Sequence, residues 1–454
     1  MNLTSADELG DEIPQSVADI LIAHSNTSFI KNGNWSFLSN LTELKRLTFV
    51  NNGIRDMSEF KPSYVKNLAN LDYLTIDRNN LNIFPVEKFT ELKRLVYLCL
   101  ICNQLQTLGE VQWNLPLLES LIVSSNQITG VRAKQLNGLV SLRRLDMSNN
   151  RITYFSLKVL DSLPKLKFLD LSDNRLFYLS EYNVVHKNLQ SVRLRNNLFE
   201  FLDPLAFNGL MVLQNIIAAE NYIKEPPHTR SDKNLTSVSN LSFLKNKIEK
   251  LSPLFFDNFP GTYHISLSKN KIRHIANDTF RRVTNLGILC MDYNEIETIP
   301  HNLFQHLHHL SFIYLANNRI KILAPGILKG LPKFTEVFLL DNPIVCNCSN
   351  VPLAKWLDGS MTLSKYYPRC QYPESLENQT LSFAVLPSNC SDHQVIKESP
   401  VVSVHDATVT AQTTHDPTKL TFLFELKYIA AVFALLLACH CVLCLKAAIL
   451  RDSV

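Results

Sequence analysis

The chain has 454 residues with a formal net charge of +4, and 46% of the residues are hydrophobic. These values exclude the compositions typical of disordered, collagen-like and strongly basic nucleic-acid-binding proteins. Two counts lie far outside ordinary usage, 72 Leu and 42 Asn against only 12 Gly. A surplus of leucine and asparagine is what a repeat with a regularly spaced asparagine produces, so the composition predicts a repeat protein rather than a series of separate domains.

A pattern of the type Leu-x-x-Leu-x-Leu-x-x-Asn-x-Leu recurs thirteen times, at intervals of 23 to 27 residues. In its clearest copy, Leu169 and Leu171 alternate as in a strand with one buried face, and Asn174 follows where the chain must turn. Thirteen such strands predict a parallel sheet, in which each asparagine amide bonds backbone groups of its own and the neighbouring coil. The repeated asparagines are Asn52, Asn79, Asn103, Asn126, Asn150, Asn174, Asn197, Asn221, Asn246, Asn270, Asn294, Asn318 and Asn342.

The second half of each repeat carries apolar residues three positions apart, as in Phe304, Leu307 and Leu310. These residues are predicted to pack an outer wall against the sheet, because a single repeat has no core of its own. The repeats cover 36–344, and a weaker coil is predicted within the N-terminal segment 1–35.

On these residues the chain resembles the 24-residue typical class of extracellular leucine-rich repeat proteins. The resemblance implies an α/β fold, a right-handed, horseshoe-shaped solenoid whose parallel strands line the concave side. It implies no chemistry and no cofactor. The sequence contains no Gly-x-Ser-x-Gly, no Walker loop, no Gly-x-Gly-x-x-Gly and no His-Glu-x-x-His, so none of these enzyme motifs predicts a catalytic site.

Four cysteines follow the last repeat, Cys346, Cys348, Cys370 and Cys390. Four cysteines allow three disulfide pairings, and a zinc site is the alternative. The stretch 345–390 resembles the cysteine-rich C-terminal cap of the same family, which implies the pairs Cys346–Cys370 and Cys348–Cys390. A cap is expected here because an open solenoid end exposes both its apolar core and an unpaired strand edge.

The C-terminal part changes composition, from a polar stem at 391–427 to an apolar run at 428–445 and a short tail at 446–454. The apolar run has 18 residues without Asp, Glu, Lys or Arg, and as a helix it spans about 27 Å, close to the thickness of a bilayer core. A buried core helix is the alternative, but no domain follows that would bury it. We therefore predict one transmembrane helix with a cytoplasmic tail.

The N-terminus conflicts with this topology, because its first 15 residues are polar and contain no apolar signal core. Insertion tail-first would leave the solenoid in the cytosol. The cysteine cap and ten glycosylation sequons indicate the exterior instead, and the hypothesis that reconciles them is that a signal segment precedes the given start. The predicted glycosylation sites are Asn26, Asn34, Asn40, Asn234, Asn240, Asn277 and Asn378.

A binding site is predicted on the concave face, where residues that alternate with the buried strand leucines project. Exposed aromatic side chains beside fixed charges are typical of protein-binding surfaces. The alternative is that Asp170 and Arg193 merely neutralise each other, worth at most about 1 kcal/mol when exposed. The predicted contact residues are Asp146, Asp170, Asp173, Arg193, Arg195, Tyr293, Phe312, Tyr314 and Phe338.

Three further cysteines, Cys99, Cys102 and Cys290, are predicted to lie exposed on the concave side. Cys99 and Cys102 could form a local bridge, which strand geometry disfavours, or one cysteine could join a second chain and give a homodimer. The histidine-rich piece around His301, His306, His308 and His309 is predicted to be solvated rather than to bind a metal.

Taken together, the sequence predicts a single-pass type I protein of the plasma membrane whose leucine-rich ectodomain binds another protein, and neither nucleic acid nor a cofactor. The resemblance extends to adhesion and innate-recognition ectodomains of animals such as insects. Adhesion or co-receptor work is the first prediction, recognition of a microbial or complement-like ligand the second, and a cytosolic, tail-anchored scaffold the third.

Overall fold

The computed structural model describes residue 13 and residues 16–23, 35–57, 60–180, 184–225, 234–329, 331–332, 335–359, 367–382, 385–387 and 390. The chain separates into two units, Met1–Gln394 and Val395–Val454, and all described residues belong to the first. The predicted stem, transmembrane helix and tail lie outside the described residues. Within the described ranges, no helix combines the length and apolarity that crossing a bilayer requires.

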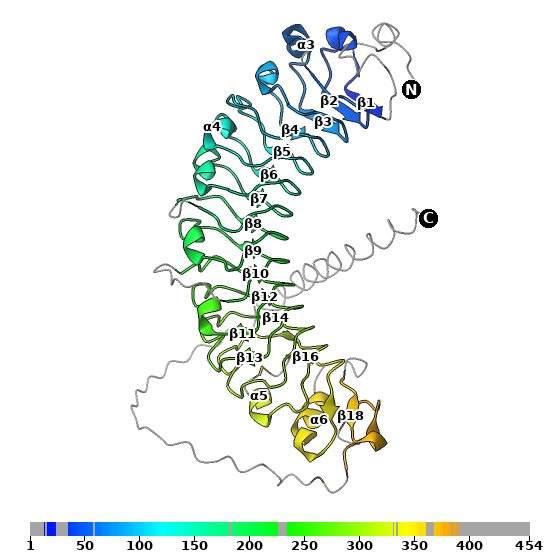
Figure 1. Cartoon of the computed structure of the whole chain (residues 1–454), viewed down its shortest axis with the longest axis vertical. Coiled ribbons are helices and arrows are strands. Elements are labelled where there is room, and N and C mark those ends of the chain that lie inside the picture. The colour runs from blue at the N-terminus through cyan, green and yellow to red at the C-terminus, as the bar shows by residue number, and fades with distance from the viewer. Residues whose placement is uncertain are drawn as a thin grey trace, which may run out of the picture. The chain divides into compact units, whose positions relative to one another are not determined.

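One strand from each coil joins a single parallel sheet, which has 14 strands in the described part of the chain. Neighbours in the sheet are neighbours in sequence because each coil returns the chain to the same edge, one coil further along (Figure 1). The predicted α/β solenoid with a long parallel sheet is confirmed. The strands are β1 Asp19–Ala23, β2 Arg46–Val50, β3 Tyr73–Asp77, β4 Tyr97–Cys99, β5 Ser120–Ile122, β6 Arg144–Asp146, β7 Phe168–Asp170, β8 Ser191–Arg193, β9 Asn215–Ile217, β10 Asn240–Ser242, β12 His264–Ser266, β14 Ile288–Cys290, β15 Phe312–Tyr314 and β16 Glu336–Phe338.

Short helices and turns occupy the side of the coils opposite the sheet (Figure 1). Four of them, beginning at Pro62, Pro204, Pro253 and Pro325, start with a proline, whose fixed φ suits the first helical turn. The outer elements are η1 Ser36–Asn40, α3 Pro62–Asn67, η2 Val86–Phe89, α4 Ala133–Leu136, η3 Leu157–Ser162, η4 Pro204–Phe207, η5 Pro253–Phe255 and α5 Pro325–Lys329.

The core lies between the sheet and this outer wall. Leu169 and Leu171 of the sheet side are at most 1% exposed, and Phe304, Leu307 and Leu310 of the outer wall are at most 2% exposed. The leucine periodicity therefore fills one continuous apolar interior that runs through all coils.

The repeated asparagines form the ladder that the sequence predicts. In one coil, Asn150 Nδ2 donates to Val123 O of the preceding coil at 3.0 Å and to Met147 O of its own coil at 3.0 Å. Its Oδ1 accepts from Ile128 N at 2.9 Å. Each amide thus satisfies buried backbone groups that would otherwise remain unpaired.

The residue just before each ladder asparagine has a left-handed backbone, with φ between 50° and 57° in all thirteen coils. Such a conformation costs a non-glycine residue about 1 to 2 kcal/mol. The hydrogen bonds of the ladder offset this cost, so residues as different as Glu220 and Tyr293 occupy the position.

Beyond the last coil, the chain forms β17 Ile344–Val345, η6 Cys348–Asn350, α6 Val351–Asp358, β18 Cys370–Tyr372 and η8 Glu374–Leu376. Disulfides join Cys346 to Cys370 and Cys348 to Cys390, the pairing that the resemblance implies. Leu353 and Leu357 of α6 are fully buried, so this segment covers the apolar end of the solenoid as a cap must.

Candidate functional site

Strand pairing brings the predicted concave residues of the central coils side by side. Asp146 of β6 pairs in register with Asp170 of β7, and Asp170 pairs with Arg193 of β8. Equivalent side chains on neighbouring parallel strands lie about 4.8 Å apart. The concave face therefore presents fixed columns of side chains, each set by one position of the repeat.

Asp146 is less exposed than the sequence predicts, with only 9% of its surface accessible. Its carboxylate accepts hydrogen bonds from Ser148 N at 3.1 Å, from Ser148 Oγ at 2.7 Å and from Arg144 at 3.1 Å. These bonds fold the carboxylate against its own strand, so Asp146 supports Arg144 rather than offering itself to a ligand.

Asp170 and Arg193 form the ion pair that the alternative interpretation expected, with Oδ2 and an Nη nitrogen 3.5 Å apart. The Arg193 side chain remains 58% exposed, whereas that of Asp170 is 17% exposed. An exposed pair of this kind contributes at most about 1 kcal/mol. Arg193 therefore keeps donors for a partner while Asp170 orients it.

A second charged group lies one coil further along and includes Glu220, which the sequence analysis missed. Glu220 accepts from Arg195 Nη2 at 2.9 Å and from Lys245 Nζ at 3.3 Å. Partial burial alone would raise the pKa of Glu220, but hydrogen bonds and charge from Arg195 and Lys245 outweigh burial and lower that pKa. Glu220 directly precedes the ladder residue Asn221. Comparing the residues at this position in successive coils would have identified it from the sequence.

Asp173 also occupies that left-handed position, with φ 55°. Its Oδ1 accepts from Nδ2 of Asn196, the equivalent residue of the next coil, at 2.8 Å. The column before the ladder asparagines is thus a row of interacting polar side chains at the edge of the concave face.

Three of the predicted aromatic residues form a stack near the C-terminal end of the sheet. The rings of Tyr314 and Phe338 are nearly parallel, with centroids 4.7 Å apart and planes at 5°. The ring of Phe312 lies 6.5 Å from that of Tyr314, at 19°. All three side chains are half-buried, so the stack offers a preformed apolar surface whose ordering entropy is already lost.

Tyr293 projects from the adjacent edge and is 53% exposed. Lys269 Nζ lies 5.4 Å from the centroid of its ring, within range of a cation–π interaction. Aromatic surface and positive charge therefore meet at this end of the molecule.

The concave cysteines are less accessible than predicted. Cys99 is 6% exposed, and burial raises the pKa of its thiol. Cys290 Sγ lies 3.6 Å from His264 Nε2, and desolvation lowers the pKa of His264 to about 4. Because this imidazole is neutral near pH 7, it provides no positive charge that would activate the Cys290 thiol as a nucleophile.

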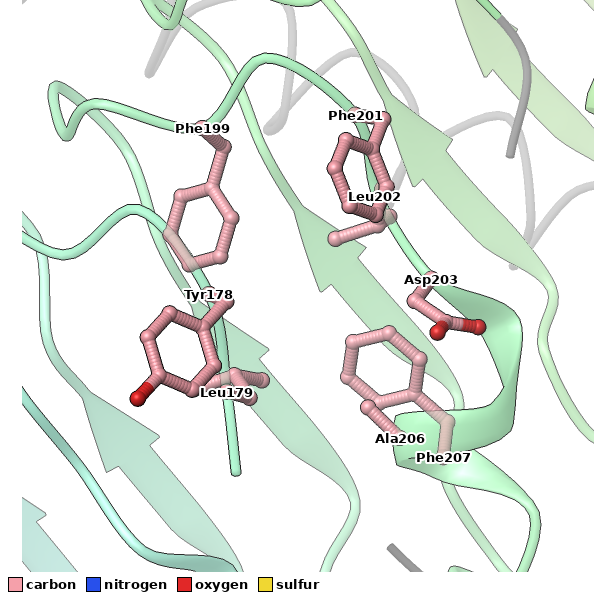
Figure 2. A pocket seen from close by; sticks show the side chains of 8 residues that line it. All are labelled: Tyr178, Leu179, Phe199, Phe201, Leu202, Asp203, Ala206 and Phe207. Atoms are coloured by element: carbon pink, nitrogen blue, oxygen red, sulfur yellow. The ribbon is translucent and has the colours of Figure 1, made fainter. Parts of the chain in front are cut away.

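Two small hollows lie on the surface of the described part of the chain. Figure 2 shows a hollow at the outer turns, where the rings of Tyr178, Phe199, Phe201 and Phe207 surround about 10 Å³, the space of a single water. A second hollow of about 30 Å³ lies on the sheet between Arg144 and Arg193. Sites for drug-sized ligands are typically about 300 to 1,000 Å³, so neither hollow would hold such a ligand.

The described residues contain no group of three potential metal ligands among His, Cys, Asp and Glu. The side chains of His301, His306, His308 and His309 are exposed.

The predicted glycosylation sites differ in accessibility. Asn40, Asn234, Asn277 and Asn378 are exposed, whereas Asn26 and Asn34 lie outside the described residues. Asn240 is half-buried on β10, where its Nδ2 donates to Asn215 Oδ1 at 3.3 Å. Asn240 is thus a poorer acceptor than its sequon suggests.

Comparison with known families agrees with this geometry. A family described as leucine rich repeat matches residues 69–128, 116–176 and 284–344. The chain is a leucine-rich repeat solenoid. No curated protein matches its sequence, and the matches indicate no catalytic family.

Solved structures share the solenoid at low identity. TLR13 in its complex with ssRNA13 is 20% identical, with a TM-score of 0.57 over 81% of this chain and 60% of that chain. A structure of the octameric complex of Latrophilin 3, Unc5D and FLRT2 (LRR) is 20% identical, with a TM-score of 0.52 over 71% of this chain and 91% of that chain. The leucine-rich repeat chain described here therefore spans less than two thirds of the length of TLR13, and the likeness concerns the fold.

Proposed function

We propose that this leucine-rich repeat chain is a cell-surface protein that binds another protein through its concave face, as an adhesion molecule or co-receptor. The observation that carries the proposal is the stack of Phe312, Tyr314 and Phe338 on a rigid sheet. Aromatic side chains held in well-packed positions are the residues that dominate binding energy at protein interfaces.

The charged residues of the central coils complement this aromatic end. Arg193 and the group formed by Arg195, Glu220 and Lys245 provide oriented, partly exposed charges. Charges of this kind set partner choice and association rate more than affinity. We assign the stack to affinity and the charged residues to selectivity.

Placement outside the cell is part of the proposal. Two disulfides close the cap, and disulfides persist in oxidising compartments. Exposed sequons at Asn40, Asn234, Asn277 and Asn378 fit the same compartment. Membrane attachment through 428–445, with the tail inside, remains a prediction from the sequence.

The test is a cell-clustering assay with the full chain expressed on suspended cells. Adhesion predicts clusters that the double substitution Tyr314→Ala with Phe338→Ala abolishes. The matched control is Phe177→Ala with Phe201→Ala, two exposed aromatics of the outer turns that are 53% and 38% accessible. Surface staining with an antibody to an N-terminal tag confirms equal display of all variants.

The outcomes separate the candidate functions. Clusters lost only in the concave variant support adhesion, whereas capture of a soluble serum or haemolymph protein without clustering, lost in the same variant, supports innate recognition. Equal behaviour of the two double variants would contradict a concave site, and an intracellular location of the tag would favour the cytosolic scaffold.

A further inference from the structure

Two neighbouring coils carry an unusual concentration of positive charge on the turn edge of the solenoid, away from the aromatic stack. They contain the ladder asparagines Asn246 and Asn270, and five lysines and one histidine lie at matching positions of the two coils. We call this set the basic grid. Its members are Lys245, Lys247 and Lys250 from one coil and Lys269, Lys271 and His274 from the next, and all six side chains are exposed.

The backbone fixes the spacing of the grid. A short additional parallel ladder, β11 Lys250–Leu251 with β13 His274–Ile275, places Lys250 directly beside His274. Lys245 and Lys269 both occupy the left-handed position before a ladder asparagine, with φ 56° and 57°. The backbones at equivalent positions of the two coils are therefore about one strand spacing, roughly 4.8 Å, apart.

Most of this charge is not neutralised. Lys245 contacts Glu220 and Lys269 covers the Tyr293 ring, but no ion pair involves Lys247, Lys250 or Lys271 within the described part of the chain. The acidic side chain within the two turns is Glu249. Lysine charges at equivalent positions of adjacent coils repel each other, so an anionic ligand would relieve a repulsion that the fold imposes.

The grid is bounded on both sides. The next coil presents Glu295 and Glu297 at the same edge, and Glu295 accepts from Arg273 at 2.9 Å and from Arg319 at 2.7 Å. The preceding coil presents Tyr222 at the position equivalent to Lys247. The positive charge is thus a local feature of two coils and not a property of the whole edge.

We propose that the basic grid binds a linear sulfated polysaccharide. Lysine ammonium groups are compact point charges without a fixed fork, which suits the dispersed sulfates of a flexible chain. Proteins that bind single-stranded nucleic acid without sequence preference combine their cations with a series of aromatic rings on which bases stack. Neither turn contains Phe, Tyr or Trp at 245–250 or 269–274. The exposed rings beside the grid are single tyrosines on opposite sides of it, Tyr222 in the preceding coil and Tyr293 next to Lys269. They do not form a series of stacking rings, so the polysaccharide is favoured over a nucleic acid.

The test measures binding of the purified full chain to immobilised heparin of defined length over a range of salt concentrations. The triple variant Lys247→Gln, Lys250→Gln and Lys271→Gln should bind at least about tenfold more weakly at 0.15 M salt. The magnitude of the negative slope of log affinity against log salt concentration should decrease by about 2. The reason is that each lysine contact that is removed no longer releases counterions on binding.

The control variant removes the same charge elsewhere, through Lys93→Gln, Lys165→Gln and Lys187→Gln, all at exposed positions of other coils. Two results support the proposal: the control variant binds heparin with the affinity of the wild type, and the wild type binds desulfated heparin more weakly than heparin. No heparin binding by the wild type, or equal losses in both triple variants, overturns it. Tighter binding of a single-stranded oligonucleotide than of heparin overturns the choice of polysaccharide. The concave variant Tyr314→Ala with Phe338→Ala should bind heparin normally, which keeps this result independent of the proposed function.

Discussion

At the scale of single residues, each ladder asparagine contributes more to the stability of the fold than any exposed ion pair does. Each amide replaces several backbone partners that a turn between stacked coils cannot supply for itself. The exposed ion pairs of the concave face are individually weak by comparison. Stability therefore depends on buried asparagines, and this leaves the concave side chains free to vary.

The substitution Asn174→Ala tests this assignment. Asn174 Nδ2 donates to Met147 O at 3.0 Å and Leu171 O at 3.1 Å, and its Oδ1 accepts from Ile152 N at 3.0 Å. Removing the amide leaves these buried groups unpaired, so the free energy of unfolding should fall by about 3 kcal/mol. Urea denaturation followed by circular dichroism measures it. Asn82→Ala, at an exposed position outside the ladder, should change it by less than about 0.5 kcal/mol; an equal loss in both variants would contradict the ladder account.

Residue types and their spacing sufficed to predict the strands and the ladder, because each depends on a position that recurs in every coil. The cap occurs once, and its disulfide pairing was implied only by the family resemblance. Accessibility was harder to predict. Cys99 and Asp146 occupy concave positions of the repeat, yet they are buried by their own neighbours, Cys99 beside Tyr97 and Asp146 beneath Arg144. Burial at such a position depends on the size and conformation of the adjacent side chains, which the repeat pattern does not specify.

At the scale of elements, close packing of successive coils on the outer side depends on glycines that a simple leucine pattern overlooks. An added Cβ at Gly209 would lie 2.1 Å from Val184 O, and one at Gly261 would lie 1.8 Å from Thr236 O. Both contacts are with the backbone of the preceding coil, which cannot move without separating the coils. These two positions therefore set how tightly neighbouring outer turns approach each other.

The matched experiment compares Gly261→Ala with Gly130→Ala. The first forces a backbone clash, whereas a Cβ at Gly130 meets nothing closer than Tyr154 O at 3.9 Å. We expect Gly261→Ala to lower the free energy of unfolding by about 1 to 3 kcal/mol, as overpacking does. Gly130→Ala should be neutral or slightly stabilising, because alanine restricts the unfolded chain. Thermal unfolding of both variants measures the difference, and a neutral Gly261→Ala would show that the outer turns have room to separate.

At the scale of the whole molecule, three surfaces divide the work. In the proposed functions, the inner sheet carries the aromatic stack and the oriented charges, the turn edge carries the basic grid, and the outer wall provides packing. Lys245 lies where the first two surfaces meet, because it contacts Glu220 and also belongs to the grid. A solenoid allows this division because each coil contacts only its neighbours. Side chains in one column can change without disturbing the leucines that form the core.

If the protein lies outside the cell, the exposure of each sequon predicts which asparagines carry a glycan. If the chain folds in the secretory pathway, Asn40, Asn277 and Asn378 should each carry a glycan, because their side chains are exposed. Asn240 should carry none, because it is half-buried and its amide donates to Asn215 at 3.3 Å. Single Asn→Gln substitutions in the full chain, expressed in animal cells, should therefore increase gel mobility at the first three positions and leave it unchanged at Asn240.

Treatment with an N-glycosidase provides the control, since it should bring all four variants and the wild type to the same mobility. A wild-type chain whose mobility does not respond to the enzyme would place the solenoid in the cytosol. A mobility change for Asn240→Gln equal to that at the exposed sites would mean that glycan transfer precedes folding of β10. In that case the sugar would lie on the concave face between the central charges and the aromatic stack, and a protein ligand could not cover both at once.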